Sequence, residues 1–459
     1  MKPMTQLIPV VADKKAPGYR VRLTLAYLGI FIISAGDTVR YAIGFPAWGT
    51  VCVLLAIFSL TLFLRSGGVA TLRRMPYTLT ALLALMLLSV TWSFYPLYTL
   101  VGYAGTLIAT AFALFLIATF SWRDLLNIFA NVFRAILASS ILFELYAALV
   151  VRGPIAPIFK NYSGPVPPSG AYYWTQGTLL RGVRIQGIVG NANLLAYVAM
   201  LGFFLFVVQY AIRQPSRKLS LASALLAVAC LALTRSASIG FAMTCAIAVG
   251  IVALIAEGHD RETRHRYYRL AWTLFGIMIF FVLVYRQEIF TLIGKSPDMT
   301  GRSDIWKAVL GLIAQRPLQG WGWISYWMPG VKPYEGLIVR DNVTYYEAHN
   351  SYLDVWLQLG IFGLLLLIAV LTFTFIKVWR LAVRHTSPLY LWPLLVFVSL
   401  ILQNLTESRM IVELGWVLVV IFAIKVNEPA ESLEPRGSSP KRLRMRVKAL
   451  AKLTNRRAG

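Results

Sequence analysis

The amino-acid sequence predicts an all-α polytopic membrane protein with about twelve transmembrane helices. Hydrophobic residues make up 58% of its 459 residues, and charged residues only 14%. This composition is too apolar for a soluble chain with one or two cores. Apolar stretches also recur at lengths that, at about 1.5 Å per helical residue, can cross a hydrocarbon core of about 30 Å.

Twelve predicted spans divide the chain into one transmembrane domain, residues 1–425, and a basic tail, residues 426–459. In chain order the spans are 23–36, 46–64, 77–94, 99–120, 126–151, 194–212, 219–234, 239–257, 270–285, 353–376, 389–404 and 410–424. No small-residue cleavage site follows the first span, so we expect a retained helix rather than a signal peptide.

The distribution of basic residues predicts which side of the membrane each loop faces. An even number of spans places both termini on one side, and that side carries 29 of the 44 Lys and Arg residues. The opposite side carries 14, and Arg134 lies within a span. Because basic loops are retained in the cytoplasm, we expect cytoplasmic termini. The net charge of +25 then reflects topology and a tail suited to anionic lipid headgroups, and it predicts no nucleic-acid partner.

Two long outer loops, residues 152–193 and 286–352, are candidates for a functional region. Both are rich in Trp, Tyr and Gly, which favours folded structure over a solvated linker. Within the second loop, apolar residues recur at helical spacing in the stretch 301–323 until Pro317 and the glycines end the run. We expect a short interfacial helix here, or a helix that only caps the bundle.

His349 is the one histidine that faces outward in this topology, because the other three lie in predicted cytoplasmic loops. It stands beside Glu347 and Asn350 at the start of a predicted span. A neutral imidazole, whose unperturbed pKa is about 6.5, can accept a proton from a hydroxyl group. These residues alone leave two interpretations, a general base or a structural histidine.

Three outward arginines near predicted helix ends are candidates for binding phosphate, because a guanidinium fork matches phosphate oxygens. They are Arg184, Arg235 and Arg302. The alternative for Arg235, which lies in a short turn between two spans, is contact with lipid phosphate. The segment that follows Arg184 contains glycines and asparagines that suit either a close approach of the backbone to a ligand or simple turns. They are Gly187, Gly190, Asn191 and Asn193.

Four motifs resemble the bacterial O-antigen ligase and polymerase superfamily, and its ligases in particular. They are "RIQGIVGNANLLA" (184–196), "TRSASIG" (234–240), "GRSDIW" (301–306) followed by "RPLQGWG", and "HNSYLDVWLQLG" (349–360), within about residues 180–375. The resemblance implies a GT-C-like fold in the bacterial inner membrane, with the active site on the periplasmic side. It implies an undecaprenyl pyrophosphate-linked glycan as donor, lipid A-core as acceptor, and no required metal.

The resemblance also implies roles for the candidate residues. Arg184, Arg235 and Arg302 would stabilise the charge that develops on the departing pyrophosphate. His349 would take the proton of the acceptor hydroxyl in a single inverting displacement, with Asp304, Glu347 and Glu407 as alternative bases. Glu347 and Asn350 would orient the ring or the acceptor, and Asn191 and Asn193 would support the site. The outer loops contain no Cys/His cluster and no paired acidic motif for a divalent cation, so we expect neither a metal ion nor another cofactor.

Three alternative functions remain open at this point. An O-antigen polymerase would extend another lipid-linked glycan, and a protein O-glycosyltransferase would modify a protein. A lipid-linked glycan transporter would place its site near the bilayer midplane. Most of the unusual polar residues gather at one face instead, with Arg134, Glu144 and Glu413 as the main intramembrane charges. The transporter remains an alternative because Glu144 and Glu413 could pair or line a lipid cleft.

Overall fold

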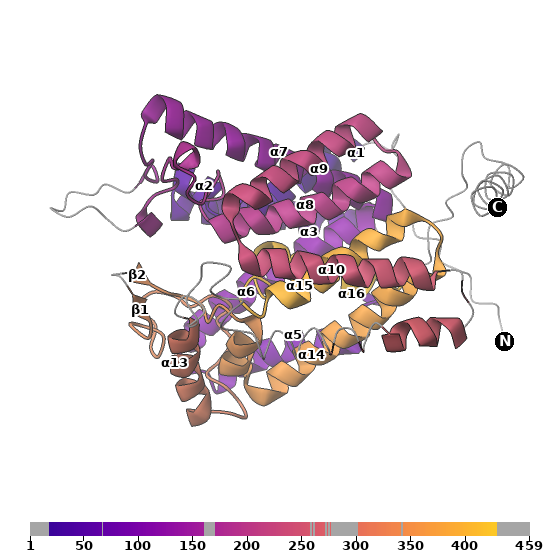
Figure 1. Ribbon diagram of the computed structural model, residues 1–459. Helices are drawn as coiled ribbons and strands as arrows, with labels where there is room; N and C mark the ends of the chain where they lie inside the picture. The colour runs from indigo at the N-terminus through magenta and orange to yellow at the C-terminus, as the bar shows by residue number, and fades with distance from the viewer. Residues whose placement is uncertain are drawn as a thin grey trace, which may run out of the picture. The chain divides into compact units, whose positions relative to one another are not determined.

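The computed structural model describes most of the chain and is almost entirely helical (Figure 1). The described residues are 18–66, 68–159, 170–257, 259, 262–270, 273, 276, 302–340 and 343–428. Most of the predicted span 270–285, residues 286–301 of the second loop and nearly all of the basic tail lie outside this set.

Helices account for the elements of the described chain apart from one small hairpin. The α-helices are α1 (Tyr19–Ser34), α2 (Thr38–Ile43), α3 (Phe45–Arg65), α4 (Val69–Leu72), α5 (Tyr77–Leu88), α6 (Pro96–Thr119), α7 (Trp122–Tyr146), α8 (Ala192–Ile212), α9 (Arg217–Thr234), α10 (Ala237–Ala256), α13 (Arg302–Gln315), α14 (Ser351–Arg384), α15 (Leu391–Gln403) and α16 (Glu413–Lys425). Short 3-10 turns are η1 (Ser89–Thr91), η3 (Gly170–Tyr172), η4 (Leu179–Arg181) and η6 (Pro388–Tyr390), and η2 (Ala147–Val151) is π-helical. Strands β1 (Val339–Arg340) and β2 (Val343–Thr344) pair antiparallel.

The fold class predicted from the sequence is confirmed. Helices occupy the predicted spans wherever the structure describes them. Seven segments of the described chain are long and apolar enough to cross a membrane: Phe45–Arg65, Pro96–Thr119, Trp122–Val151, Ala192–Ile212, Arg217–Thr234, Ala237–Ala256 and Ser351–Arg384. The apolar helices Tyr77–Thr91 and Pro388–Gln403 are shorter. The protein is therefore an all-α polytopic membrane protein, and the number of twelve spans stays a prediction.

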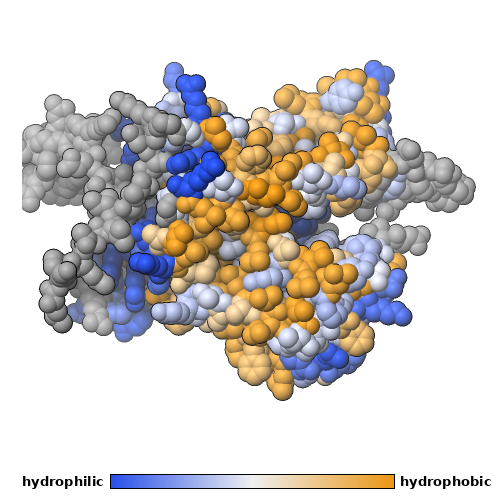
Figure 2. Space-filling view, turned by 180° about the vertical axis from the view of Figure 1, so that it is seen from behind, coloured by the Kyte–Doolittle hydropathy of each residue, from blue (hydrophilic) through white to orange (hydrophobic). Residues whose placement is uncertain are grey.

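Helix α16 forms the centre of the bundle, because residues 414–425 are all buried. It packs on α6, where Trp416 donates a hydrogen bond to Thr110 Oγ1 at 2.9 Å. Helices α7, α8 and α9 pack together on one side, and α5, α13 and α14 lie on the other (Figure 1). Hydrophobic residues cover the middle of the face drawn in Figure 2, with hydrophilic residues toward its ends, as expected for a protein surrounded by lipid.

Residues 302–340 and 343–348 form a packed layer over one end of the bundle. Helix α13 buries Ile305, Val309 and Ile313, one residue per turn on the same face. These side chains share a hydrophobic core with Trp327 and Tyr334 of the following loop. The predicted helix is confirmed, and this part of the outer loop is folded as expected.

Helix α14 is broken near its start. Gly360 has φ 68° and ψ −171°, so the helical hydrogen bonds stop there and resume beyond it. The segment after α13 supplies replacements: Trp321 N–H donates to Leu357 O at 3.0 Å, and Ile361 N–H donates to Pro317 O at 2.9 Å. The break therefore locks the outer layer onto the first turns of α14, the helix that begins just after His349.

Candidate active site

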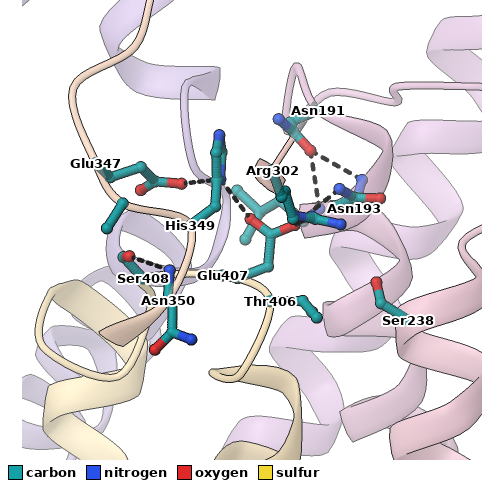
Figure 3. A network of polar contacts seen from close by, with 12 residues as sticks. Asn191, Asn193, Ser238, Arg302, Glu347, His349, Asn350, Thr406, Glu407 and Ser408 are labelled. Atoms are coloured by element: carbon teal, nitrogen blue, oxygen red, sulfur yellow. Dashed lines mark hydrogen bonds and ion pairs between the residues drawn. The ribbon is translucent and has the colours of Figure 1, made fainter. Parts of the chain in front are cut away.

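Polar side chains from four segments meet at the end of the bundle where α14 begins (Figure 3). Glu347 and His349 precede α14, Arg302 begins α13, Asn193 lies in the first turn of α8, and Glu407 lies between α15 and α16. The bond between Asn193 and Glu407 joins positions 214 residues apart. Tertiary packing thus brings together motifs that are distant in the sequence.

The backbone around His349 is held in an unusual conformation. Its φ of 50° lies in the left-handed region, which costs free energy for a residue other than glycine. Asn350 caps α14, because its side-chain oxygen accepts from two backbone N–H groups of the first turn at 3.0 and 3.1 Å. The Asn350 N–H donates to Ser408 Oγ at 3.0 Å, and the Ser408 hydroxyl donates to Asp354. These hydrogen bonds hold the backbone next to His349 in place.

Two carboxylates face the same ring nitrogen of His349. Nδ1 lies 2.7 Å from Glu347 Oε1 and 3.4 Å from Glu407 Oε2. Both carboxylate side chains are 5% exposed, whereas the imidazole is 21% exposed. A proton is thereby favoured on Nδ1. Among the described residues none makes a polar contact with Nε2, which leaves this nitrogen for a ligand.

The charges of this cluster shift the protonation of its members. Burial alone would lower the pKa of His349, but the charges of Glu347 and Glu407 outweigh it and raise the pKa well above its ordinary value. Burial would likewise raise the pKa of Glu347, yet the positive charges of Arg409, His349 and Arg302 hold it below its ordinary value. Without substrate the pair is therefore an imidazolium and a carboxylate at neutral pH.

Glu407 links this pair to two of the predicted phosphate-binding arginines. Its Oε1 accepts from Arg302 Nη2 at 2.8 Å and from Asn193 Nδ2 at 2.9 Å. Asn193 Oδ1 accepts in turn from Arg184 Nη2 at 2.5 Å, and Arg184 Nε donates to the carbonyl of Thr234 at 2.8 Å. A continuous chain of polar contacts thus connects the imidazole with two guanidinium groups.

Two of the predicted site residues lie outside this chain of contacts. Arg235 ends α9 with φ 49° and is exposed, and within the described part of the chain it makes no polar contact with the cluster. Asp304 is exposed in the first turn of α13, and it likewise contacts none of the described cluster residues. Asn191 serves as the cap of α8, accepting from the N–H of Asn193 at 2.8 Å, and so acts on the site through the helix.

The loop after Arg184 uses its backbone donors internally. Gly187 has φ 61°, as its predicted turn requires. The N–H groups of Gln186 and Gly187 donate to Glu144 Oε1 at 2.9 and 2.7 Å, and the Thr175 hydroxyl donates to the same oxygen at 2.9 Å. These two N–H groups are therefore committed to a carboxylate of α7 and are not free for a ligand.

The pairing considered for Glu144 and Glu413 is wrong. Glu144 is buried and holds the loop just described, whereas Glu413 pairs with Arg40 at 2.7 Å at the start of α16. Arg134 bonds three neutral side chains, Ser223 Oγ at 2.6 Å, Asn131 Oδ1 at 2.6 Å and Gln209 Oε1 at 3.1 Å. Each of these charges thus has partners within the bundle.

Sequence reasoning gave Glu407 too small a role and overlooked Arg409. Burial lowers the pKa of Arg409, but its electrostatic interactions with Glu347, Tyr326 and Glu413 raise that pKa above its ordinary value. This cation therefore belongs to the same cluster. The signal was present in "NLTESRM" (404–410), where an acid and a base stand just before the last predicted span on the outer side. Charged residues at the end of a membrane span are costly to place there, and they therefore indicate a functional site.

Three side chains of the site offer ligand atoms to a metal ion. Donor atoms of Glu347, His349 and Glu407 all lie within 4.8 Å of one another. A cation there would compete with Arg302 for Glu407 and with the Nδ1 proton for His349. The arrangement fits a charge-paired imidazole better than a metal centre.

Comparison with known proteins finds similarity in the part of the chain that carries several of these residues. Residues 221–368 match the O-antigen ligase family. Exopolysaccharide production protein ExoQ of Rhizobium meliloti (strain 1021) is 25% identical over 199 residues, which cover 41% of this chain and 45% of ExoQ. The matched segment is similar to proteins of the O-antigen ligase and polymerase superfamily. The chain thus aligns with less than half the length of this curated relative.

The superfamily match contains α9, α10, α13 and the start of α14, and therefore Arg235, Arg302, Glu347 and His349. Members of the superfamily are glycosyltransferase-like enzymes with lipid-linked, membrane-associated substrates. Glu407 lies beyond the matched segment, and its contacts with Arg302 and His349 join it to the superfamily residues.

Proposed function

We propose that this protein is an O-antigen ligase, which transfers a glycan from undecaprenyl pyrophosphate to lipid A-core at the periplasmic face of the bacterial inner membrane. The observation that carries the proposal is the chain of contacts from His349 through Glu407 to Arg302 and Arg184. It sets a candidate base beside two guanidinium groups at one end of a membrane bundle, as transfer from a pyrophosphate carrier requires.

His349 acts as the base through Nε2. Once Nε2 is unprotonated, it takes the proton of the acceptor hydroxyl while Nδ1–H remains directed at the carboxylates. The acceptor oxygen forms a bond to the anomeric carbon of the donor glycan as the bond from that carbon to the pyrophosphate oxygen breaks. The electron pair leaves with the pyrophosphate, and the anomeric configuration inverts.

Arg302 and Arg184 stabilise the negative charge that collects on the departing pyrophosphate. We assign to Arg235, which is exposed at the end of α9, a contact with the donor as it enters. Fixed guanidinium groups supply the positive charge that a divalent cation provides in other phosphate sites. The reaction therefore calls for no cofactor.

A glycan polymerase is the second candidate, and the similarity to ExoQ favours it, because that relative is described as an exopolysaccharide production protein. The same site would then transfer the glycan onto another carrier-linked glycan instead of lipid A-core. A protein O-glycosyltransferase shares the donor chemistry but has no specific observation in its favour. A transporter would need its polar site near the midplane, whereas this cluster lies at helix ends.

The glycans of a deletion strain test the function. A ligase deletion leaves bare lipid A-core while long glycan accumulates on the undecaprenyl carrier. Lipid A-core bearing a single repeat would instead show a polymerase. Unchanged glycans on both lipids would refute a role in either reaction, and re-expression of the wild-type chain is the control.

A further inference from the structure

Glu407 has a fixed backbone and a buried side chain that reaches across to other segments. Its carbonyl accepts from the Ser351 N–H at 3.2 Å and from the Ser351 hydroxyl at 3.4 Å. The loop before α16 is thereby attached to the first residue of α14. From this support the side chain, 5% exposed, extends to α13 and α8 (Figure 3).

The two carboxylate oxygens of Glu407 divide three donors between them. Oε1 binds Arg302 at 2.8 Å and Asn193 at 2.9 Å, and Oε2 faces His349 Nδ1 at 3.4 Å. The donors belong to three different segments, two of which are also joined where Trp306 Nε1 of α13 donates to the carbonyl of Ala348 at 3.1 Å. A buried carboxylate with charge-assisted bonds to several segments fixes the distances between them.

The bonds that hold Arg302 and Arg184 leave part of each guanidinium group available. Arg302 contacts Glu407 through Nη2 alone, and its other N–H groups bind no other described residue. Arg184 uses Nε and Nη2 for Thr234 and Asn193, and its Nη1 is not engaged by the described residues. Each arginine is thus held by one part of its fork while another part can meet an anion.

We propose that Glu407 is a positioning residue that holds Arg302 and, through Asn193, Arg184 at the spacing a pyrophosphate group requires, in register with the imidazole of His349. The inference rests on the proposed function, because it takes the two arginines as the donor site. A carboxylate so close to an anion site would repel the donor if it only filled space. Its contribution is the preorganisation of the cations around it.

The test measures binding of inorganic pyrophosphate to the purified full-length protein, by calorimetry, together with KM and kcat for the lipid-linked donor. Glu407→Ala should weaken pyrophosphate binding about 10- to 100-fold, as expected when charge-assisted hydrogen bonds are lost. Glu407→Gln, which keeps an acceptor oxygen for Arg302 and Asn193, should restore most of the affinity. Glu428→Gln, which removes charge from a carboxylate paired with Arg74 at 3.1 Å outside the cluster, is the matched control and should bind normally.

A double-mutant cycle shows whether Glu407 acts through Arg302. If it does, Glu407→Ala combined with Arg302→Ala should bind pyrophosphate no more weakly than Arg302→Ala alone, apart from the share carried by Arg184. Fully additive losses would overturn the positioning role. Should Glu407→Ala fail to fold, Asn193→Ala cuts the same link from α8, and it should raise the donor KM with little change in kcat.

Two other results would also overturn the inference. Tighter pyrophosphate binding by Glu407→Ala would mean that the carboxylate competes with the donor. Normal binding with kcat abolished would make Glu407 the base itself. The proposed function fails separately, if Arg302→Ala and Arg184→Ala both bind pyrophosphate as well as the wild-type protein does.

Discussion

At the scale of single residues, the state of His349 decides whether the site can work. The carboxylates that orient the imidazole also raise its pKa, so a base is available only in the fraction of molecules that have lost the Nε2 proton. Since the pKa is raised on folding, the ion pair stabilises the fold at acidic and neutral pH. That stabilisation is lost as the pH rises through the raised pKa.

His349→Ala should abolish turnover while the protein stays folded and still binds inorganic pyrophosphate. General-base catalysis contributes about 10²- to 10⁴-fold, so kcat of the purified enzyme should fall by that order. A chelator should alter neither the wild-type protein nor the variant. Near-normal turnover in the alanine variant would make the ring structural, and the base would then be sought at Asp304, Glu347 or Glu407.

Glu347→Gln should move the acidic limb of the kcat/KM profile to lower pH. In the wild-type protein this limb reports deprotonation of His349 and should lie above about 6.5, the ordinary pKa of histidine. Removing the Glu347 charge removes the largest influence that raises the pKa. Glu335→Gln, an exposed carboxylate in the same loop, is the control. An identical limb in wild type and Glu347→Gln would exclude control of the base by Glu347.

The sequence predicted which types of residue the site contains better than it predicted which of them contact each other. His349, Arg184 and Arg302 were singled out from topology and motifs, and the structure connects them through polar contacts, whereas the outward position of His349 stays a prediction. The pairing of His349 with Glu407 was not predicted, because the two lie 58 positions apart and only folding brings them together. Arg235 and Asp304 show the converse, since a suitable residue type in a motif does not ensure that its side chain contacts the cluster.

At the scale of elements, α7 carries the loop that presents Arg184. Glu144 accepts three hydrogen bonds with one oxygen, and Ser140, one turn earlier, accepts from the Ile188 N–H at 3.3 Å. A side chain at Gly187 would meet Ser140 Oγ at 2.6 Å, so the loop lies directly on the helix. The position of Arg184 thus depends on a carboxylate of α7 that binds the backbone of its loop.

Glu144→Ala should destabilise this loop by leaving two backbone N–H groups without an acceptor. Each unsatisfied buried group costs about 1–3 kcal/mol, so a lower unfolding temperature in detergent is expected, together with a raised donor KM. Glu144→Gln retains an acceptor oxygen and should be affected less. Equal stability of the alanine variant and the wild-type protein would show that other groups hold the loop.

Hydrophobicity predicted the helices well but not the break in α14. The stretch "LQLGIFGLLLL" (357–367) reads as continuous apolar helix. Gly360 departs from helical geometry because the segment after α13 inserts its own backbone groups there, and a side chain at Gly360 would collide with the carbonyl of Leu318. Local pattern cannot reveal a conformation that is set by a distant partner.

At the scale of the whole molecule, the assignment of function depends on which side of the membrane the cluster faces. The excess of basic residues on the side of the termini predicts that the cluster end faces outward. Helix α9 connects the two ends, since it begins at Arg217 and ends at Thr234, whose carbonyl accepts from Arg184. Residues near its start should therefore face the cytoplasm.

Cysteine labelling in intact cells tests this orientation. Glu335→Cys, exposed in the outer layer, should react with a membrane-impermeant maleimide. Lys218→Cys, exposed at the start of α9, should react only after permeabilisation. The parent chain controls for its three native cysteines. Labelling of Lys218→Cys from outside, with protection of Glu335→Cys, would invert the topology and place the cluster in the cytoplasm.

The distant position of Glu407 has a consequence for biosynthesis. Asn193 and Arg302 precede it by 214 and 105 residues, so both are made well before their shared partner. At about 5–20 residues per second, Asn193 leaves the ribosome on the order of 10–40 s earlier than Glu407. Until Glu407 is made, Asn193 and Arg302 lack this shared partner, and a chain that ends before residue 407 never acquires it. Assembly of the site thus reports that translation of the bundle has run nearly to completion.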